Sequence, residues 1–324
     1  MSNTTSITAL AAITAFAAGA CTDNIDSDRC EQPWCAVPDG KGDAGGSPWV
    51  QTVEANGIEL AYLEAGHGPL VILLHGFPDT PYTWSGVAPR LVAAGYHVVA
   101  PFLRGYAPSA IPPTDTTTTT LGRDVLALAT ALGEDQVILV GHDWGATAAY
   151  AAAALDPARV AKLVTIAIPH PIALAMHPEV PLPPHFMELV QPDATERVQE
   201  HDLRYIDELI ARWSPTWDVP AGESNAVKRT FRVPGSLNAA LGYYRAVTAG
   251  FPPEAATPLP MPSLTFHGSD DHAITQSVFA DQHRGYSGQF ELVSLPTGHF
   301  VQREAESEFV AKLLAFLQGQ AAHE

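Results

Sequence analysis

The chain has 324 residues, of which 46% are hydrophobic and 16% are charged, and its formal net charge is −18. This length and hydrophobic content suffice for a substantial core, which excludes disorder over most of the chain. With 35 acidic residues against 17 basic residues and no cluster of Lys or Arg, the chain is not expected to bind nucleic acid.

The first residues are typical of an export signal rather than of a folded element. Residues 7–20 form a run of small and apolar residues that is too short to span a bilayer. The run ends Ala18-Gly19-Ala20-Cys21, which resembles the lipobox of bacterial lipoproteins, so Cys21 is the expected lipid acceptor. We therefore predict a signal over residues 1–21 and export to the cell envelope or periplasm, with membrane attachment through a lipid on Cys21. A cytoplasmic protein with an N-terminal helix is the alternative.

Residues 22–48 are polar, acidic and rich in glycine, which predicts a flexible tether. Cys30 and Cys35 lie in this segment and could form a disulfide in an oxidising compartment. A metal site is less favoured there, because no histidine and no third cysteine lies nearby.

Strands and helices alternate from residue 49 onward. Two strands, Val50–Glu54 and Ile58–Glu64, flank the turn signal Ala55-Asn56-Gly57 and predict a hairpin. The next predicted elements, in chain order, are strand 70–74, helix 84–94, strand 96–100, helix 121–132, strand 136–140, helix 146–155 and strand 162–168. This alternation is typical of an α/β fold with a mostly parallel sheet and helices on both faces.

The alternation stops at residues 169–262, which are rich in proline and contain three predicted helical stretches without a clear strand. It resumes with strand 262–267, a helix near 275–283, strand 290–295 and a terminal helix over 304–317. We therefore predict one core domain, residues 49–168 and 263–324, into which residues 169–262 are inserted as a helical cap.

A candidate nucleophile lies where strand 136–140 meets the following helix. The sequence there is Gly141-His142-Asp143-Trp144-Gly145, a strand, sharp turn and helix in the arrangement of a nucleophile elbow, with Asp where hydrolases more often carry Ser. The glycines allow the helix to pack closely on the strand, and the tight turn presents one side chain above the sheet edge. An aspartate that only caps the helix is the structural alternative.

Two partners for Asp143 follow two later strands. His267-Gly268-Ser269-Asp270-Asp271 ends one strand, and Gly298-His299-Phe300 follows the last strand. The order nucleophile, acid, histidine is that of a catalytic triad in this kind of fold. We expect Asp271 to orient and stabilise the imidazole and His299 to act as the base.

The motifs together resemble the epoxide-hydrolase branch of the α/β-hydrolase fold superfamily. Besides the elbow, the resemblance rests on His75-Gly76-Phe77-Pro78-Asp79 and Arg104-Gly105-Tyr106, and it extends over residues 49–318. It implies an oxyanion hole made by the backbone N–H groups of Phe77 and Trp144. It also implies an α/β-hydrolase fold with a helical cap and an enzyme without metal or cofactor.

The aspartate nucleophile suits displacement at a saturated carbon. A free Asp has a pKa of about 3.9, so it is ionised at neutral pH and attacks without a base. Opening of an epoxide, or expulsion of a halide, would leave an alkyl ester on Asp143. Water activated by His299 would then hydrolyse this ester while the oxyanion hole holds the charge.

The sequence of the core leaves open which leaving group the enzyme expels. The residues of the predicted cap that could stabilise this group bear on the choice. An epoxide oxygen needs an O–H donor, and the resemblance matches Tyr243-Tyr244-Arg245 to a ring-opening tyrosine of epoxide hydrolases, which is Tyr244 here. The second such tyrosine aligns with Phe186, which has no donor, so His185 and Tyr205 are the candidate substitutes. Because Tyr244 matches a ring-opening tyrosine, the substrate is expected to be a small apolar epoxide.

Two other functions stay open. A haloalkane dehalogenase would use Trp144 as a halide ligand, and Trp213 and Trp217 in the cap are compatible with it, but Phe77 has no side-chain donor where a second ligand is expected. Fluoroacetate dehalogenases carry an arginine directly after the nucleophile, where it holds a carboxylate. Trp144 stands at that position here, which counts against a small acidic substrate. The third candidate is a non-catalytic binding protein of the same fold in the envelope. The complete triad argues against it, because a binding protein does not need a base that activates water.

Overall fold

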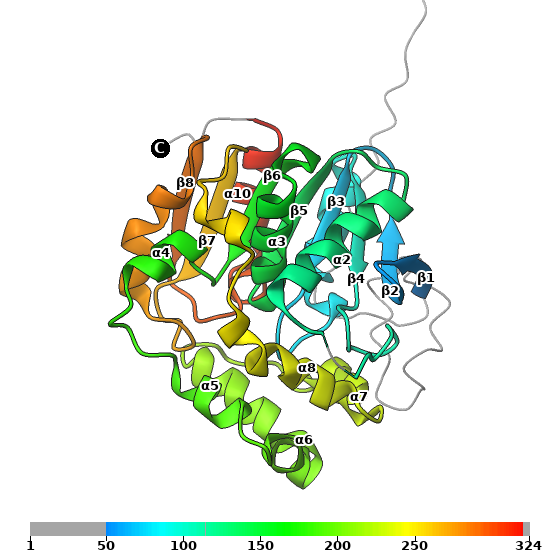
Figure 1. Ribbon diagram of the computed structural model, residues 1–324, viewed down its shortest axis with the longest axis vertical. Coiled ribbons are helices and arrows are strands. Elements are labelled where there is room, and N and C mark those ends of the chain that lie inside the picture. Colours follow the sequence, from blue (N-terminus) through cyan, green and yellow to red (C-terminus); the bar gives the residue numbers. More distant parts are fainter. Residues whose placement is uncertain (1–49, 114, 320–324) are drawn as a thin grey trace, which may run out of the picture.

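The computed structural model describes residues 50–113 and 115–319, so the predicted signal, the tether and all three cysteines lie outside the described residues. An eight-stranded sheet with the order β1-β2-β4-β3-β5-β6-β7-β8 forms its centre (Figure 1). The strands are β1 (Val50–Ala55), β2 (Ile58–Ala65), β3 (Leu70–Leu74), β4 (His97–Pro101), β5 (Val137–His142), β6 (Val160–Ile166), β7 (Ser263–Gly268) and β8 (Phe290–Leu295). β1 and β4 pair antiparallel with β2, and every other pair is parallel, which confirms the predicted α/β architecture.

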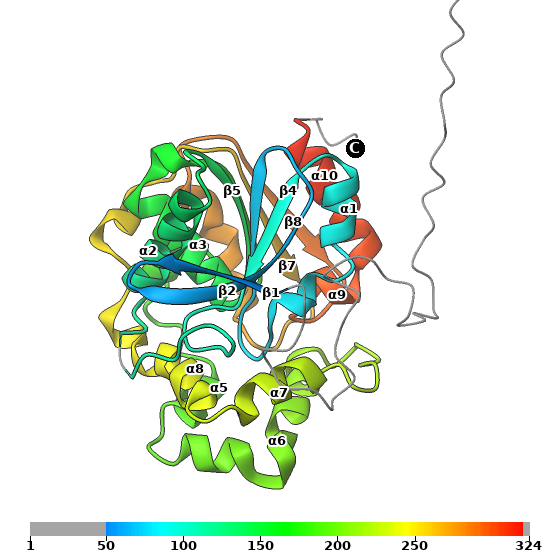
Figure 2. The same cartoon turned by 90° about the vertical axis from the view of Figure 1, so that its right-hand side faces the viewer.

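Helices cover both faces of the sheet, as predicted (Figure 2). α2 (Thr118–Ala131) and α3 (Trp144–Leu155) lie on one face, and α1 (Ala88–Ala93), α9 (Val301–Glu304) and α10 (Glu306–Leu317) lie on the other. α3 is rich in alanine and almost wholly buried. A Cβ on Gly122 of α2 would lie 2.7 Å from the backbone nitrogen of Ala152. Small residues on both helices therefore allow them to pack directly against each other.

The parallel strands place the loops that follow them at one edge of the sheet. All five residues of β3 and all six of β5 are buried, as expected of strands covered on both faces. Because β3, β5, β7 and β8 run in the same direction, the segments after Leu74, His142, Gly268 and Leu295 emerge together. The segments that carry Phe77, Asp143 and Trp144, Asp271 and His299 each follow one of these strands, whereas Tyr244 lies within residues 169–262.

Residues 169–262 contain helices that lie beside and beyond this edge (Figures 1 and 2). They are α4 (Pro171–Met176), α5 (Pro184–Leu189), α6 (Ala194–Trp213), α7 (Asn225–Arg232) and α8 (Ser236–Arg245). The expectation of three helical stretches is wrong for this fully described segment, because Pro171 and Pro184 each begin an additional short helix. α6 is also broken, since the backbone leaves helical geometry over Glu200–Leu203. The division into a core and a cap stays a prediction.

The predicted helix 84–94 is shorter in the structure. Its first part is a 3₁₀ turn over Pro81–Trp84, and α1 begins only at Ala88, with Pro89 in its first turn. Proline is compatible with the first turn of a helix but not with its interior, so α1 cannot extend further back through this position.

Two later helices differ in type or extent. The predicted helix near 275–283 is a 3₁₀ helix over Gln276–Gly285. Three of its four buried positions, Phe279, Gln282 and Gly285, are three residues apart, which is the spacing that a 3₁₀ helix aligns on one side. The predicted terminal helix over 304–317 begins two residues later, as α10, and the short helix α9 precedes it, because the backbone of Ala305 between them is not helical.

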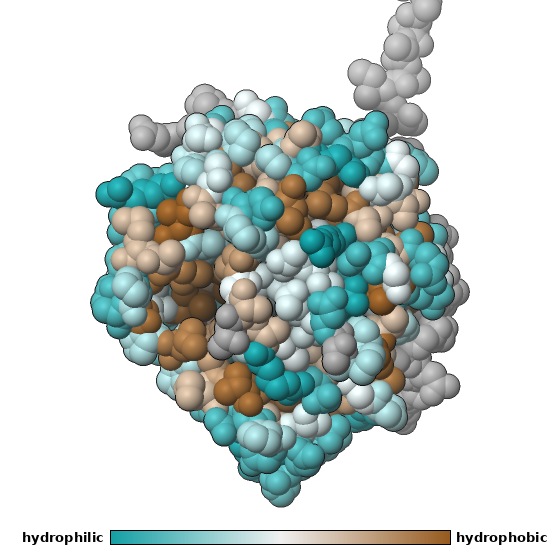
Figure 3. Space-filling model, viewed as in Figure 1, coloured by the Kyte–Doolittle hydropathy of each residue, from teal (hydrophilic) through white to brown (hydrophobic). Residues whose placement is uncertain are grey.

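Large hydrophobic side chains are exposed mainly around α4 and α5. Leu174, Met176, Leu182 and Met187 are each between 39% and 58% exposed. Figure 3 shows a hollow surrounded by hydrophobic residues on the face that carries α4. Among the described residues no helix is both long and apolar enough to cross a membrane.

Candidate active site

Asp143 lies on a sharp turn between β5 and α3. Its φ of 51° and ψ of −120° are unusual for a residue other than glycine, which is typical of a strained functional position. A Cβ on Gly141 would lie 2.4 Å from the carbonyl oxygen of Gly145, and a Cβ on Gly145 would lie 2.2 Å from that of Leu74. Both glycines are therefore required by the close approach of strand, turn and helix.

The loop after β3 lies directly against the Asp143 carboxylate. The backbone N–H of Phe77 donates a hydrogen bond to Asp143 Oδ1 at 2.8 Å. A Cβ on Gly76 would lie 2.4 Å from the Cβ of Asp143, so only glycine fits there. Trp144, the second predicted oxyanion donor, begins α3 at the same turn. Phe77 thus has the geometry to stabilise negative charge on an oxygen of Asp143.

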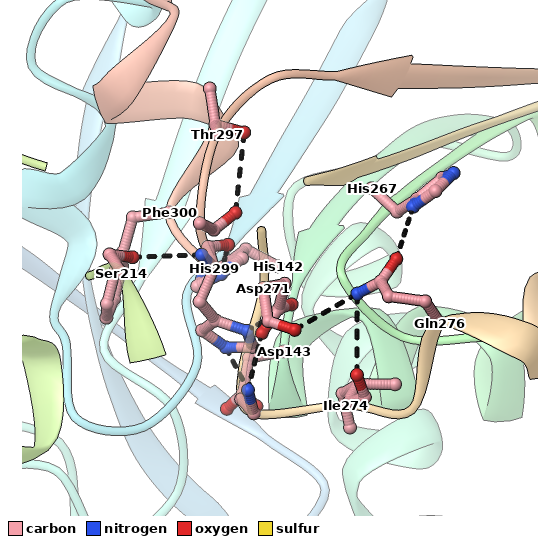
Figure 4. Close-up of polar contacts among 12 residues, drawn as sticks. His142, Asp143, Ser214, His267, Asp271, Ile274, Gln276, Thr297, His299 and Phe300 are labelled. Atoms are coloured by element: carbon pink, nitrogen blue, oxygen red, sulfur yellow. Dashed lines mark hydrogen bonds and ion pairs between the residues drawn. The ribbon is translucent and has the colours of Figure 1, made fainter. Parts of the chain in front are cut away.

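His299 joins the two aspartates (Figure 4). Its Nδ1 lies 2.8 Å from Asp271 Oδ2, and its Nε2 lies 3.5 Å from Asp143 Oδ2. Asp271 Oδ1 accepts a hydrogen bond from the backbone N–H of Ala273 at 2.7 Å. All three side chains of the predicted triad are buried, and the structure brings them together from the ends of three strands.

The charges of these groups support one another. Burial alone would raise the pKa of Asp143, but His299, His142 and the Phe77 N–H together lower it. Burial alone would lower the pKa of His299, but the carboxylates of Asp271 and Asp143 raise it to about 10. At neutral pH the site therefore holds an ionised Asp143 beside a protonated His299.

Tyr244 faces this site from α8. Its side chain is 1% exposed, and its ring lies edge-on to Phe77 at 5.3 Å and to Trp144 at 5.2 Å between ring centroids. Burial and the charge of Asp143 raise the pKa of Tyr244 well above its ordinary value, while Trp144 opposes this. No acceptor for its hydroxyl proton occurs among the described residues, so this protonated donor, next to Trp144 and within the field of Asp143, is free to bind a substrate oxygen.

α5 contributes Phe186 and His185 next to Tyr244. The Phe186 ring lies 5.0 Å from the Tyr244 ring, where an epoxide hydrolase tyrosine was expected, and it has no polar atom. His185 is 4% exposed, with ring distances of 4.6 Å to Trp213 and 5.9 Å to Tyr244. Burial lowers the pKa of His185 to about 4 against the opposing charge of Asp143. His185 is therefore neutral at pH 7 and lies within the electrostatic reach of the nucleophile.

Tyr205, the other candidate donor, is engaged elsewhere. Its hydroxyl donates to Glu188 Oε2 and accepts a hydrogen bond from Arg212 Nη2 at 3.3 Å. Burial and Glu188 raise the pKa of Tyr205. The structure thus brings Tyr244 and His185 to the triad but not the hydroxyl of Tyr205. Trp217 packs on Phe300, with ring centroids 5.8 Å apart.

Two residues of the site were missed in the sequence. Ser214 and Glu304 both hydrogen-bond to the loop that carries His299. Ser214 lies 85 residues before His299 and directly after α6, and no local pattern indicates such a contact. Glu304 lies only five positions after His299, which was the available signal. No group of three or more metal-binding side chains occurs within residues 50–113 and 115–319.

The chain is similar to known hydrolases over most of its length. A family profile described as the alpha/beta hydrolase fold matches residues 69–306, which include every predicted site residue. AB hydrolase superfamily protein YfhM of Bacillus subtilis is 30% identical, over 83% of this chain and 98% of that protein. An epoxide hydrolase of Caballeronia sordidicola is also 30% identical, over 82% of this chain and 92% of its own length. The crystal structure of Epoxide Hydrolase A from Mycobacterium thermoresistibile is 25% identical, with a TM-score of 0.71 over 86% of this chain and 100% of that chain.

Proposed function

The chain belongs to the α/β-hydrolase family as an epoxide-hydrolase-like enzyme, and from this premise we propose that it hydrates epoxides to vicinal diols through an ester on Asp143. One observation carries the proposal. The ionised Asp143 is flanked by the His299–Asp271 pair on the core side and by two uncharged donors, Tyr244 and His185, on the cap side. A base for water and donors for a leaving oxygen are thus present around one carboxylate.

In the first step Asp143 acts as the nucleophile. One of its carboxylate oxygens forms a bond to an epoxide carbon, while the bond between that carbon and the ring oxygen breaks. The ring oxygen leaves as an alkoxide and takes a proton from Tyr244, which yields a hydroxyalkyl ester. The lowered pKa of Asp143 supports this role, because the carboxylate needs no base to become reactive.

In the second step water cleaves the ester. His299 takes a proton from water while the water oxygen bonds to the carbonyl carbon of Asp143. The N–H of Phe77, 2.8 Å from Oδ1 of Asp143, supports stabilisation of the resulting oxyanion. Collapse of this intermediate expels the diol oxygen, which takes the proton back from His299. The carboxyl group of Asp143 then passes the second proton of the water to His299, which restores the carboxylate and the protonated imidazole of the free enzyme.

The pKa of His299 explains how this residue can be protonated in the free enzyme and act as a base in the ester intermediate. In the free enzyme the two aspartates keep its pKa at about 10, so it is protonated. Esterification removes the negative charge of Asp143 and therefore lowers this pKa. The proton that His299 then loses balances the one that Tyr244 gave to the alkoxide. The imidazole becomes a free base only after the ester has formed.

We assign the second ring-opening donor to His185 in place of the missing tyrosine at Phe186. A neutral imidazole has one N–H donor, and such a group can polarise a substrate oxygen without being charged. No hydrogen bond of His185 to another described residue competes with this role. Tyr244 transfers the proton, and His185 donates a hydrogen bond to the same oxygen.

The test compares epoxide and halide substrates in matched variants. Tyr244→Phe should reduce ester formation from a styrene-oxide-type epoxide by about 10²–10⁴-fold, because the alkoxide loses its proton donor, and His185→Phe should reduce it less. Tyr205→Phe removes the same atom at a site engaged with Glu188 and should leave the rate unchanged. Diol formation that is equally fast in Tyr244→Phe and Tyr205→Phe would refute the assignment.

The same assay separates the alternatives. Bromide release from short bromoalkanes that exceeds diol formation would favour a haloalkane dehalogenase, for which Trp144 beside the nucleophile is the supporting feature. Absence of turnover in the wild type, and no change on Asp143→Ala, would favour a binding protein.

We also propose export and lipid attachment at Cys21, which rests on the sequence of residues 7–21 alone. Mass spectrometry of the full chain expressed in a bacterial host should detect a shortened, lipid-modified N-terminus. Cys21→Ser should abolish the modification.

A further inference from the structure

The loop that carries His299 is held by two side chains from outside the triad. Glu304 Oε2 accepts a hydrogen bond from the N–H of Gly298 at 2.7 Å, and its Oε1 accepts one from the N–H of Phe300 at 2.9 Å. Ser214 accepts a hydrogen bond from the N–H of His299 at 2.9 Å through its Oγ, and it donates to Glu304 Oε1 at 2.7 Å. Three consecutive backbone N–H groups thus donate to Ser214 or Glu304. We call these two side chains the Ser214–Glu304 brace.

The Ser214 side of this arrangement is buried, while Glu304 is partly exposed. Ser214 is 1% exposed and His299 is fully buried. A Cβ on Gly298 would lie 2.4 Å from the Cα of Ser214, so the two backbones are in direct contact. On the other side of the loop, the Nε2 of His142 hydrogen-bonds to the carbonyl oxygen of His299 at 3.0 Å. The backbone of His299 is therefore fixed on both sides.

The brace also connects helix α6 to the triad. Ser214 follows Trp213, the last residue of α6, and the Trp213 ring lies 4.9 Å from the His299 ring. The carbonyl oxygen of Trp213 accepts a hydrogen bond from the N–H of His272, the residue after Asp271. The end of α6 therefore contacts both the loop of the base and the loop of the acid (Figure 4 shows Ser214 beside His299).

We propose that Ser214 and Glu304 are positioning residues that aim the imidazole of His299 at the water that cleaves the ester. This inference rests on the proposed two-step reaction. Asp143 lies 3.5 Å from His299, but its own position is set by the N–H of Phe77 and by the glycines of its turn, which the brace does not contact. Loss of the brace therefore affects the step that uses His299 and spares the step that uses Asp143.

The expected sizes follow from the contacts that each variant removes. A displacement of about 1 Å in a reacting group costs about 10²-fold in rate. Glu304→Ala, which frees two backbone N–H groups and the Ser214 hydroxyl, should slow ester hydrolysis by about this factor, and Ser214→Ala by about 10-fold. Glu304→Gln retains an acceptor for Phe300 and Ser214 but presents an N–H₂ to Gly298, so its rate should lie between those of Glu304→Ala and the wild type.

Single-turnover kinetics test the inference with a styrene-oxide-type epoxide. Ester formation and ester hydrolysis are followed separately by rapid quenching and intact-mass measurement. We expect ester formation within about 3-fold of the wild type in all three variants, accumulation of the ester, and a shifted pH profile for hydrolysis only. Glu308→Ala on the exposed side of α10 is the control and should match the wild type in both steps.

Three results would overturn the inference when the variant has the circular-dichroism spectrum of the folded wild type. These are equal slowing of both steps, unchanged hydrolysis, or a Glu304→Gln variant that is as slow as Glu304→Ala. A variant that does not fold loses both steps together, and then Ser214→Ala decides. Failure of the proposed function is distinguishable, because it would appear as no ester on Asp143 even in a His299→Gln variant of the otherwise unchanged enzyme.

Discussion

Replacement of Asp271 by asparagine should stop the enzyme after its first chemical step. Asp271 Oδ1 accepts the Ala273 N–H at 2.7 Å, while Oδ2 lies 2.8 Å from His299 Nδ1. In Asp271→Asn the amide oxygen must face Ala273, because the opposite orientation brings two donors together. The amide NH₂ then faces Nδ1 of His299, which must become an acceptor and carry its proton on Nε2. A base with a proton on Nε2 cannot take one from water.

The loss should be large and confined to hydrolysis. The corresponding substitution in a serine protease triad lowers kcat by about 10⁴-fold through the same tautomer change, which is about 5 kcal/mol. Asp143 keeps its hydrogen bond from Phe77, so ester formation should change by less than about 10-fold. The ester should therefore accumulate to nearly one equivalent per enzyme.

Asp270→Asn is the matched control, because it removes the same charge one residue away. The Asp270 side chain is partly exposed, and the backbone N–H of Asp270 donates to the carbonyl oxygen of Thr297. Rapid-quench kinetics with intact-mass detection should find no ester in Asp270→Asn beyond the wild-type level. If Asp271→Asn slows ester formation as much as hydrolysis, or if both asparagine variants behave alike, the assignment of Asp271 is wrong.

Three further perturbations have expected outcomes. Gly76→Ala should lower ester formation by about 10²-fold or more, since its Cβ would lie 2.4 Å from that of Asp143; a variant with wild-type single-turnover rates would contradict this. Arg104→Met should lower the free energy of unfolding by about 3–5 kcal/mol, because it leaves Asp124 buried without its ion-pair partner, and urea unfolding that shows a loss below about 1 kcal/mol would argue against it. His170 has its pKa lowered to about 4 by burial, so the unfolded chain binds more protons between pH 6.5 and 4, and stability falls as the pH falls through this window. The His170→Asn variant, which can still cap α4, should lose up to about 3 kcal/mol of that dependence when urea unfolding is compared at pH 7 and pH 4.5; an unchanged difference would refute the role of His170.

The sheet and the triad were predictable because their signals are local. β3 and β5 are continuous apolar runs, and the glycines around Asp143 are needed by the turn itself. Parallel strands end at one edge, so residues that follow β5, β7 and β8 must be neighbours whatever the connections between them. The positions of Asp143, Asp271 and His299 follow from that rule, and the structure has them within hydrogen-bond or ion-pair distance.

The helices of residues 169–262 were less predictable, because their positions depend on packing. Nothing in the sequence near His185 indicates that burial keeps it neutral beside Asp143, or that Tyr205 is instead engaged with Glu188. The contact of Ser214 with His299 joins segments 85 residues apart. Such contacts arise only when the end of α6 meets the edge of the sheet.

The site is built from two parts of the chain, the loops of the sheet and the helices α5 and α8, and each part can be mutated without changing the other. The groups that make and break the ester lie on loops of the sheet, whereas His185 and Tyr244 lie on α5 and α8. A mutant library restricted to α5 and α8 should therefore yield new leaving-group preferences while it inherits the hydrolytic apparatus intact. A chimaera that exchanges all of residues 169–262 is a different case. It would have to retain the Trp213–Ser214 junction, because there the inserted segment and the general base share their hydrogen bonds.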